Sequence, residues 1–117
     1  MGVTGNDSLG VRRTLSVNGK NFDYFSLKLA EEKGIGSIAR LPYSMKVLLE
    51  NLLRYEDGRS VTSDDVRAAA SWNGKPSADD EIAFRPARVL LQDLTGVPAV
   101  VDLAAMREAM VKIGGDV

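Results

Sequence analysis

The stretch AFRPARVLLQDLTGVPAVVDLAAMREAM, residues 83–110, is the one around which the rest of this chain is expected to be organised. A short apolar strand is predicted at residues 88–91, and it ends in a polar step, QDLT, closed by Gly96. Apolar residues at helical spacing then predict a helix over residues 97–113, with Pro98 in its first turn. In open α/β sheets, ligands bind beyond the carboxyl ends of the strands. The polar step is therefore a candidate site.

Three side chains of this step are candidates for binding: Gln92, Asp93 and Thr95. The Gln92 amide can donate to a carboxylate, and Thr95 with nearby backbone N–H groups can extend an anion site. An ordinary turn explains the same residues, because Asp93 can accept from local backbone donors. The pattern alone favours the turn.

Arg85 and Arg88 flank Pro86 and form a second candidate, an anion clamp. Side chains three apart in an extended segment point to opposite faces, which weakens a shared ligand. Ion pairs with the acidic residues 79–81 are the favoured alternative.

The composition limits the chemistry. The chain has 117 residues, a net charge of −1, and neither cysteine nor histidine. Disulfides, thiolate nucleophiles, Ser–His pairs and the usual zinc or iron–sulfur ligands are thus excluded within this chain. No apolar run is long enough to span a membrane, so a cytoplasmic protein without membrane partners is expected. The near-zero charge counts against a helix-turn-helix that binds DNA.

The first part of the chain is predicted to be a flexible tail, residues 1–11, followed by a β-hairpin. Residues 12–17 and 21–25 alternate apolar and polar positions around Asn18 and Gly19, the strongest short hairpin signal. The alternation predicts two strands with one buried face.

Four helices are predicted after it. Ser26 caps the first, which Gly34 ends; Pro42 starts the second; Thr62 or Ser63 caps the third, which runs to about residue 71. The second helix carries an apolar stripe: Met45, Leu48, Leu49, Leu52 and Leu53. The last helix carries Leu103, Met106, Met110 and Ile113 on one face. The stripes are expected to bury one another in a mixed α/β fold of four helices, a hairpin and a short central strand.

Two blocks of this sequence are distinctive: RLPYSMKVLLENLLRYEDG (residues 40–58) and IAFRPARVLLQDLTGVPAVVDLAAMREAM (residues 82–110). Together with FDYFSLKLAEEKGIGSIARLP (residues 22–42), they closely resemble the N-terminal region of the aconitase A and iron-regulatory-protein branch of the aconitase family. The resemblance covers about residues 14–115. It implies that residues 12–117 are the first portion of an α/β domain in a larger enzyme.

The resemblance also implies a reaction. Family members interconvert citrate and isocitrate through cis-aconitate, a step of the tricarboxylic acid cycle, with a [4Fe–4S] cluster whose open iron acts as a Lewis acid. Gln92 matches a substrate-contacting glutamine, and Asp93 and Thr95 line the same turn. The family's cysteines, its Asp–His pairs and its catalytic serine fall beyond residue 117. No catalytic residue or metal ligand is therefore expected here, and the chain alone is expected to be inactive.

Alternative functions stay open at this point. Iron–sulfur 2-methylcitrate dehydratases share much of the region and differ in substrate. Apo members of this branch bind messenger RNA, although an acidic segment lacks a basic surface for it. A third alternative is an interaction module that folds independently. The expected partners are citrate, isocitrate and cis-aconitate, the remaining domains in cis, and mRNA for the apo parent, which is expected to be monomeric.

Overall fold

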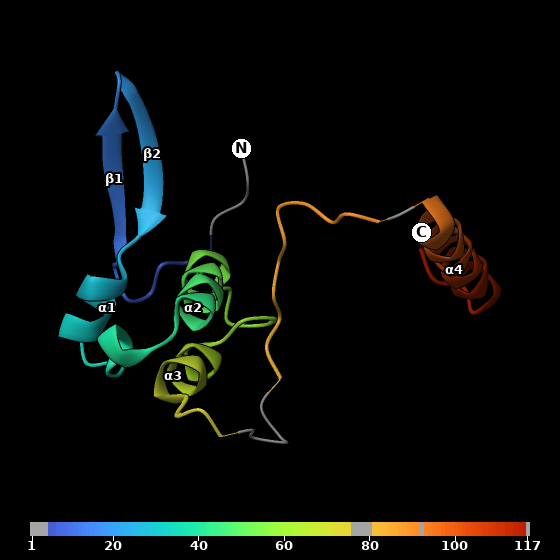
Figure 1. Cartoon of the computed structure of the whole chain (residues 1–117). Helices are drawn as coiled ribbons and strands as arrows, with labels where there is room; N and C mark the ends of the chain where they lie inside the picture. The colour runs from blue at the N-terminus through green and yellow to red at the C-terminus, as the bar shows by residue number, and fades with distance from the viewer. Residues whose placement is uncertain (1–4, 76–80, 92, 117) are drawn as a thin grey trace. The chain divides into compact units, whose positions relative to one another are not determined.

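The computed structural model describes residues 5–75, 81–91 and 93–116. The described elements are β1 (Arg12–Val17), β2 (Lys20–Phe25), α1 (Leu27–Glu32), the 3₁₀ helix η1 (Ile38–Arg40), α2 (Tyr43–Tyr55), α3 (Ser63–Ser71) and α4 (Asp93–Lys112) (Figure 1). The chain divides into unit 1 (Met1–Arg85) and unit 2 (Pro86–Val117). Helices together with an antiparallel sheet confirm the predicted mixed α/β class.

Strands β1 and β2 form the predicted hairpin. Asn18 and Gly19 adopt φ angles of 50° and 75°, the left-handed conformation that a two-residue type I′ turn requires. Leu15 pairs with Phe22, so both side chains lie on the same face. They are 53% and 54% exposed, so the expected burial of this face is wrong. A two-stranded sheet buries a face only against another element, and no described element covers this one.

Helix α1 has the predicted signals at both ends. The Ser26 hydroxyl accepts from the Leu29 backbone N–H at 3.2 Å, which satisfies one free donor at the start of the helix. Gly34 follows the helix with φ 81° and donates its N–H to the Glu31 carbonyl at 2.9 Å. A left-handed glycine is the usual way to end a helix.

Helix α2 supplies the centre of unit 1. Pro42 sits immediately before the first helical residue, where its missing N–H costs no hydrogen bond. The predicted apolar stripe is confirmed for Leu49, Leu52 and Leu53, which are 0%, 0% and 1% exposed, while Met45 and Leu48 are half-buried. Fully burying such a side chain contributes about 1.5–3 kcal/mol.

Helix α3 packs against α2 through Val66, Ala69 and Ala70, which are all buried. Thr62 is its N-cap: the hydroxyl accepts from the Asp65 N–H at 3.3 Å, and the Asp65 carboxylate accepts from the Thr62 N–H at 2.7 Å. This reciprocal capping box fixes where the helix begins.

The residues before β1 contact the end of α2. Gly5 donates its N–H to the Arg54 carbonyl at 2.7 Å. The Glu56 carboxylate, in a residue only 5% exposed, accepts from the Ser8 hydroxyl at 2.6 Å and from the Ser8 N–H at 3.2 Å. Val11 is fully buried. Of the stretch predicted as a tail, residues 1–4 lie outside the described part; the mobility of the remainder stays a prediction.

All the buried apolar residues of the described chain lie in unit 1. They are Val11, Phe25, Ala30, Ile35, Ile38, Leu41, Leu49, Leu52, Leu53, Val61, Val66, Ala69 and Ala70. The core therefore joins the hairpin, the three N-terminal α-helices and η1 in one cluster.

Unit 2 differs from the prediction in two ways. Helix α4 begins at Asp93, four residues before the expected start, so that Pro98 lies inside it. The expected strand at residues 88–91 is not formed, because a strand needs a partner and no described residue supplies one. The end of α4 follows the prediction: Gly114, with φ 79°, and Gly115 donate to the Val111 and Met110 carbonyls.

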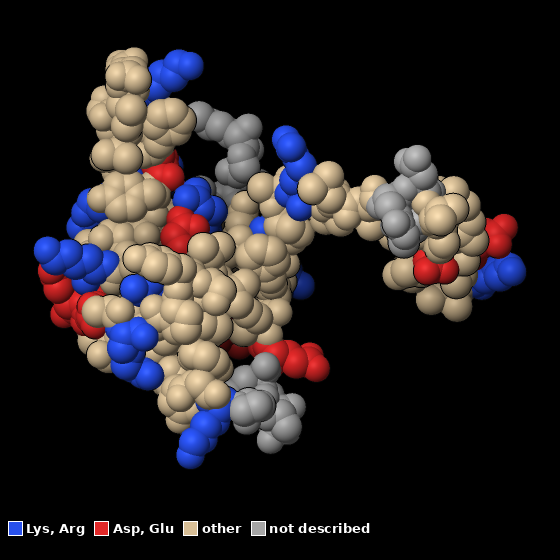
Figure 2. Space-filling view, in the orientation of Figure 1, with Lys and Arg blue, Asp and Glu red and all other residues tan. Residues whose placement is uncertain are grey.

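The apolar stripe predicted on the last helix is exposed in the structure. Leu103, Met106, Met110 and Ile113 are 61%, 64%, 42% and 78% exposed. Unit 2 holds a single helix, so the expected packing of this stripe on the other helices stays a prediction. Figure 2 shows charges of both signs interspersed over unit 1, whereas the surface over α4 is mostly uncharged. Within the described residues, no helix is long and apolar enough to cross a membrane.

Candidate functional site

The polar step predicted as a turn is the beginning of α4. Gln92 itself lies outside the described residues, while Asp93 and Thr95 belong to the first helical turn. Gly96 lies in the same helix and has no positive φ, so it does not serve as a turn glycine. The correction has a local cause: Pro98 already has a helical φ, and its missing N–H removes a single bond, to the Leu94 carbonyl.

A helix start of this kind can favour an anion. The first four backbone N–H groups of a helix have no partner within the helix, and the macrodipole places partial positive charge there. In α4 these groups belong to the residues directly after Gln92. An amide side chain has donors that suit a carboxylate, and Gln92 comes directly before this helix in the sequence.

The two arginines of the predicted clamp have different surroundings. The Arg85 guanidinium forms an ion pair with Asp57 at 3.2 Å and lies 5.4 Å from the centre of the Tyr55 ring. The sequence favoured ion pairs of these arginines with the acidic residues 79–81. Residues 79 and 80 lie outside the described part. Glu81 forms no ion pair with a described residue. Arg88 is exposed, and no described residue forms an ion pair with it. The arginines therefore do not share a partner.

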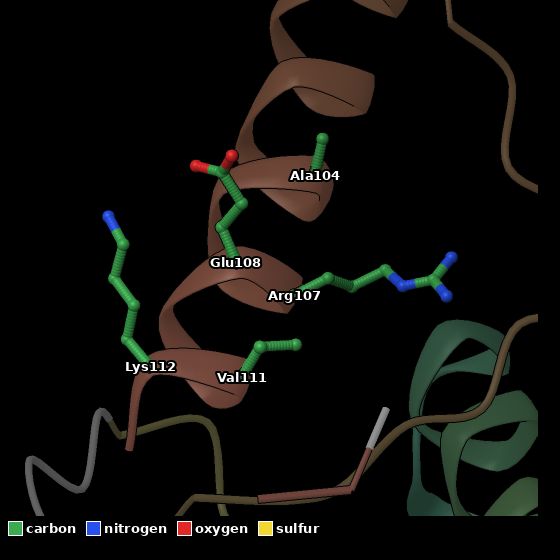
Figure 3. Close-up of a pocket in the computed structure, with 5 residues that line it drawn as sticks. All are labelled: Ala104, Arg107, Glu108, Val111 and Lys112. Carbon is green, nitrogen blue, oxygen red and sulfur yellow. The ribbon is translucent and has the colours of Figure 1, made fainter. Parts of the chain in front are cut away.

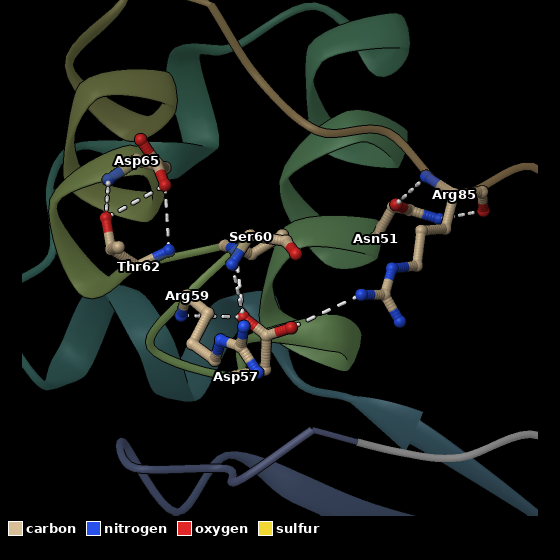
Figure 4. A network of polar contacts seen from close by, with 8 residues as sticks. Asn51, Asp57, Arg59, Ser60, Thr62, Asp65 and Arg85 are labelled. Atoms are coloured by element: carbon tan, nitrogen blue, oxygen red, sulfur yellow. Dashed lines mark hydrogen bonds and ion pairs between the residues drawn. The ribbon is translucent and has the colours of Figure 1, made fainter. Parts of the chain in front are cut away.

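Asn51 holds the backbone of Arg85 (Figure 4). Its amide nitrogen donates to the Arg85 carbonyl at 2.9 Å, and its amide oxygen accepts from the Arg85 N–H at 3.0 Å. One side chain thus satisfies both backbone groups of one residue. The arrangement resembles the pairing between two strands, with an amide side chain in place of the second strand.

Asp57 organises the loop between α2 and α3 and also reaches Arg85 (Figure 4). One carboxylate oxygen accepts from three successive backbone N–H groups, those of Arg59, Ser60 and Val61, at 2.9, 2.8 and 3.0 Å. These bonds, that of Val61 foremost, lower the pKa of Asp57 to about 2, and the charge of Arg85 adds to the effect. Asp57 is therefore fully ionised at neutral pH.

A shallow hollow runs along one stripe of α4 (Figure 3). Ala104, Arg107, Glu108, Val111 and Lys112 line it, at the spacing of successive helical turns. Arg107 lies 14 residues after Asp93, which is about 21 Å along a helix axis. The hollow is therefore separate from the helix start that carries the predicted site.

The described residues hold no group of three or more acidic side chains that could bind a metal ion. Because the sequence lacks cysteine and histidine, the [4Fe–4S] cluster implied by the resemblance does not fit any residues of this chain.

Arg85 contacts three residues that the sequence analysis did not identify as candidates: Asn51, Tyr55 and Asp57. Asp57 carried a usable signal, since Asp followed directly by Gly is typical of a turn in which the carboxylate accepts from backbone N–H groups. Asn51 carried none, because its partner lies 34 positions along the chain.

In sequence, the chain is similar to the N-terminal part of proteins of the aconitase family. These relatives carry the name aconitate hydratase A. The chain is 61% identical over 112 residues to aconitate hydratase A of Legionella pneumophila, covering 96% of this chain and 13% of that protein. It is 61% identical over 114 residues to the Bradyrhizobium diazoefficiens protein of that name, covering 97% and 13%. Aconitate hydratase A of Escherichia coli is 62% identical over 103 residues, which cover 88% of this chain and 11% of that protein.

These matches confirm the predicted resemblance to the aconitase family. The chain spans about an eighth of the length of the curated relatives that it matches, 13% in the first two. No family model matches the chain. No solved structure matches it either.

Proposed function

We propose that this chain is the N-terminal part of an aconitate hydratase, in which it supplies scaffold and one substrate contact. The observation that carries the proposal is the identity of about 60% to proteins of that name over nearly the whole chain. Such identity spans both the core of unit 1 and the QDLTG step, so it covers the scaffold and the candidate contact together. The parent is then a hydro-lyase that interconverts citrate and isocitrate through cis-aconitate.

In this proposal the Gln92 amide donates a hydrogen bond to a substrate carboxylate. The backbone N–H groups at the start of α4 add positive potential beside it, and Asp93 and Thr95 complete the same turn. The role of such a contact is to orient the substrate before water is removed or added. The remaining groups of the reaction come from the other domains in cis.

The cofactor proposed for the parent is a [4Fe–4S] cluster, which supplies a Lewis acid when bound. Its thiolate ligands cannot come from a chain without cysteine. We therefore expect the 117-residue chain to show no cis-aconitate formation with added iron and sulfide, measured by absorbance of the unsaturated product. Detectable turnover would contradict the assignment of the chain as a part only.

The test of the contact is Gln92→Ala in the full-length protein with its cluster reconstituted. We expect kcat/KM for citrate to fall at least about 10-fold, the loss that accompanies a missing hydrogen bond to a charged group. Asn21→Ala is a matched control, since Asn21 lies on the exposed hairpin. An unchanged kcat/KM in the Gln92 variant would remove this residue from the substrate contacts.

The same protein distinguishes the alternative substrate. We expect turnover of citrate in preference to 2-methylcitrate, because the matched relatives carry the aconitate hydratase name. A cytoplasmic, monomeric parent is part of the proposal and is checked by fractionation and by gel filtration. Binding of mRNA by the apo parent stays a prediction; the mixed charges on the face of unit 1 in Figure 2 do not favour it here.

A further inference from the structure

The β-hairpin of unit 1 has an apolar face that no described element covers. Leu15 pairs with Phe22, and side chains two positions apart along a strand lie on the same face. The register therefore places these side chains together, as the hairpin face: Arg13, Leu15, Val17, Lys20, Phe22 and Tyr24. In Figure 1 the turn end of the hairpin extends away from the helices of unit 1.

The apolar side chains of the hairpin face are accessible to a partner. Val17 and Tyr24 are 44% and 42% exposed, and Leu15 and Phe22 are more exposed still. Phe25, on the opposite face at the base of the hairpin, is 2% exposed and belongs to the core. A group of adjoining, exposed, large apolar side chains marks an interaction surface, and a two-stranded sheet is marginally stable without one. The hairpin face is thus half of a packing interface.

The charged side chains of the hairpin are divided between its two faces. Arg13 and Lys20 lie on the hairpin face, and neither forms an ion pair within the part of the chain that the structure describes. The single acidic residue of the two strands, Asp23, lies on the opposite face. There it accepts from the Arg12 guanidinium and, at 2.9 Å, from the Thr14 hydroxyl. The hairpin face therefore carries positive charge and no negative charge.

The two cations lie at opposite ends of the hairpin face. Lys20 and Tyr24 are four residues apart on β2, which corresponds to about 13 Å along the strand. Arg13 pairs with Tyr24, so the same length separates it from Lys20. The apolar side chains lie between them. A complementary surface is apolar in its centre and has an acidic side chain near each end.

This charge pattern disfavours two other occupants. A second copy of the chain would bring the same face against itself, so that Arg13 and Lys20 would meet further cations. A lipid bilayer would attract the cations, but the turn that would enter it first is polar, Asn18 followed by Gly19. The remaining occupant is a protein surface that supplies the two acidic groups.

We propose that the hairpin face docks another segment of the same parent protein, an apolar one flanked by acidic side chains. The inference rests on the proposed function, which supplies that parent. The chain makes up 13% of the length of the Legionella relative, so most of the proposed parent lies outside it. A segment of the same molecule is present at a high effective concentration, and a face with few apolar side chains is then sufficient for docking.

The test is photo-cross-linking in the full-length protein with Phe22→benzoylphenylalanine, followed by mass spectrometry of the joined peptides. Phe22 is 54% exposed, so the larger side chain does not disturb the core. We expect a cross-link within one molecule, to an apolar segment with acidic residues on both sides. Asn21→benzoylphenylalanine is the matched control, because Asn21 is the adjacent residue on the opposite face. It is expected to give no cross-link to that segment.

Reversing the charges tests the acidic character of the partner. Arg13→Glu together with Lys20→Glu should lower the yield of the Phe22 cross-link at least about 5-fold, because like charges then oppose each other. Lys28→Glu together with Arg67→Glu is the control, since both residues are exposed on other elements and the net charge changes equally. This pair is expected to leave the yield unchanged.

Each of the other outcomes overturns the docking proposal. A cross-link between two molecules would assign the face to self-association. Flotation of the protein with phosphatidylserine vesicles, lost on Phe22→Ala, would assign it to a lipid surface. A yield no higher than that of the Asn21 control, or unaffected by the charge reversal, would remove the proposed partner. Should the Phe22 variant not fold, Tyr24→benzoylphenylalanine on the same face replaces it.

The proposed function is judged separately on the same protein. Citrate turnover without the Phe22 cross-link would overturn the docking alone. The cross-link without citrate turnover would overturn the proposed function and leave the docking in place.

Discussion

Helices α2 and α4 have similar apolar content but opposite surroundings. In α2 the large apolar side chains occupy one stripe, and Leu49, Leu52 and Leu53 are almost fully buried. In α4 they occur on all sides, and Leu103 is 61% exposed. The difference is that unit 1 contains its own core, whereas α4 contributes none of the buried apolar residues of the described chain.

Among the substitutions that test the contrast between α2 and α4, Leu52→Ala is expected to have the largest effect on stability. Removing a fully buried leucine side chain from α2 leaves a cavity and should lower the free energy of unfolding by about 2–5 kcal/mol. Urea unfolding of the 117-residue chain, followed by tryptophan fluorescence of Trp72, measures it. A loss below about 1 kcal/mol would show that unit 1 lacks the tight core described above.

The second effect is expected from Pro98→Ala in α4. The proline lies inside the helix, where it removes a hydrogen bond and costs about 3 kcal/mol relative to alanine. The substitution should therefore slow amide exchange along residues 97–112 and raise the helical circular dichroism signal. Exchange in α2 serves as the internal control and should not change. If α4 amides exchanged at the same rate in both chains, the position of Pro98 within the helix would be wrong.

The third effect is expected from Thr62→Ala at the start of α3. The change removes one half of the capping box and should destabilise unit 1 by about 1 kcal/mol. Ser60→Ala is the matched control, because Ser60 contributes only its backbone N–H to Asp57. Equal unfolding midpoints for the two variants would contradict the role of the Thr62 hydroxyl.

A smaller effect is expected from pH. The pKa of Asp57 is about 2 in the folded chain, below its ordinary value of 3.8, so the ionised form is favoured by folding. Its stabilisation is present above about pH 4 and is lost as the pH falls toward 2. Asp57→Asn keeps an oxygen acceptor without the charge, and should flatten the pH dependence of the unfolding midpoint in this window. If the unfolding midpoint of the variant depended on pH in the same way as that of the unchanged chain, other carboxylates would cause the dependence.

The smallest effect is expected from Leu103→Ala, the counterpart of Leu52→Ala in α4. In the 117-residue chain the change should alter the free energy of unfolding by no more than about 0.5 kcal/mol, because the side chain is 61% exposed. In the full-length protein, where we expect α4 to be covered, it should cost about 2–5 kcal/mol. A small effect in both proteins would mean that α4 faces solvent in the parent too.

Sequence reasoning worked where a signal and its partner are close along the chain. Ser26 and Thr62 cap helices through bonds to residues three positions on, and the Asn18–Gly19 turn joins adjacent strands. It failed at the start of α4, since Pro98 suits the first turn of a helix as well as its interior position here. The strand at residues 88–91 could not be judged from the sequence, because strand pairing depends on partners outside it.

The candidate site shows the same limit. Pattern alone favoured a turn for Gln92, and the substrate contact came from the resemblance to a family. Asn51 and Asp57 meet Arg85 across 34 and 28 positions, distances at which local spacing carries no information. A local sequence pattern indicates hydrogen bonds between residues that are close along the chain. The contacts of Arg85 join residues that are far apart along it.

The contact between Ser8 and Glu56 has a consequence for how the chain is made. The two residues are 48 positions apart, and the ribosome adds about 5–20 residues per second. The N-terminal stretch therefore waits about 2–10 s for its partner to be synthesised, and longer for Glu56 to leave the exit tunnel. During that time Val11 has no core to enter. A nascent chain stalled before Glu56 should thus expose this stretch to chaperones, whereas one stalled well beyond it should not.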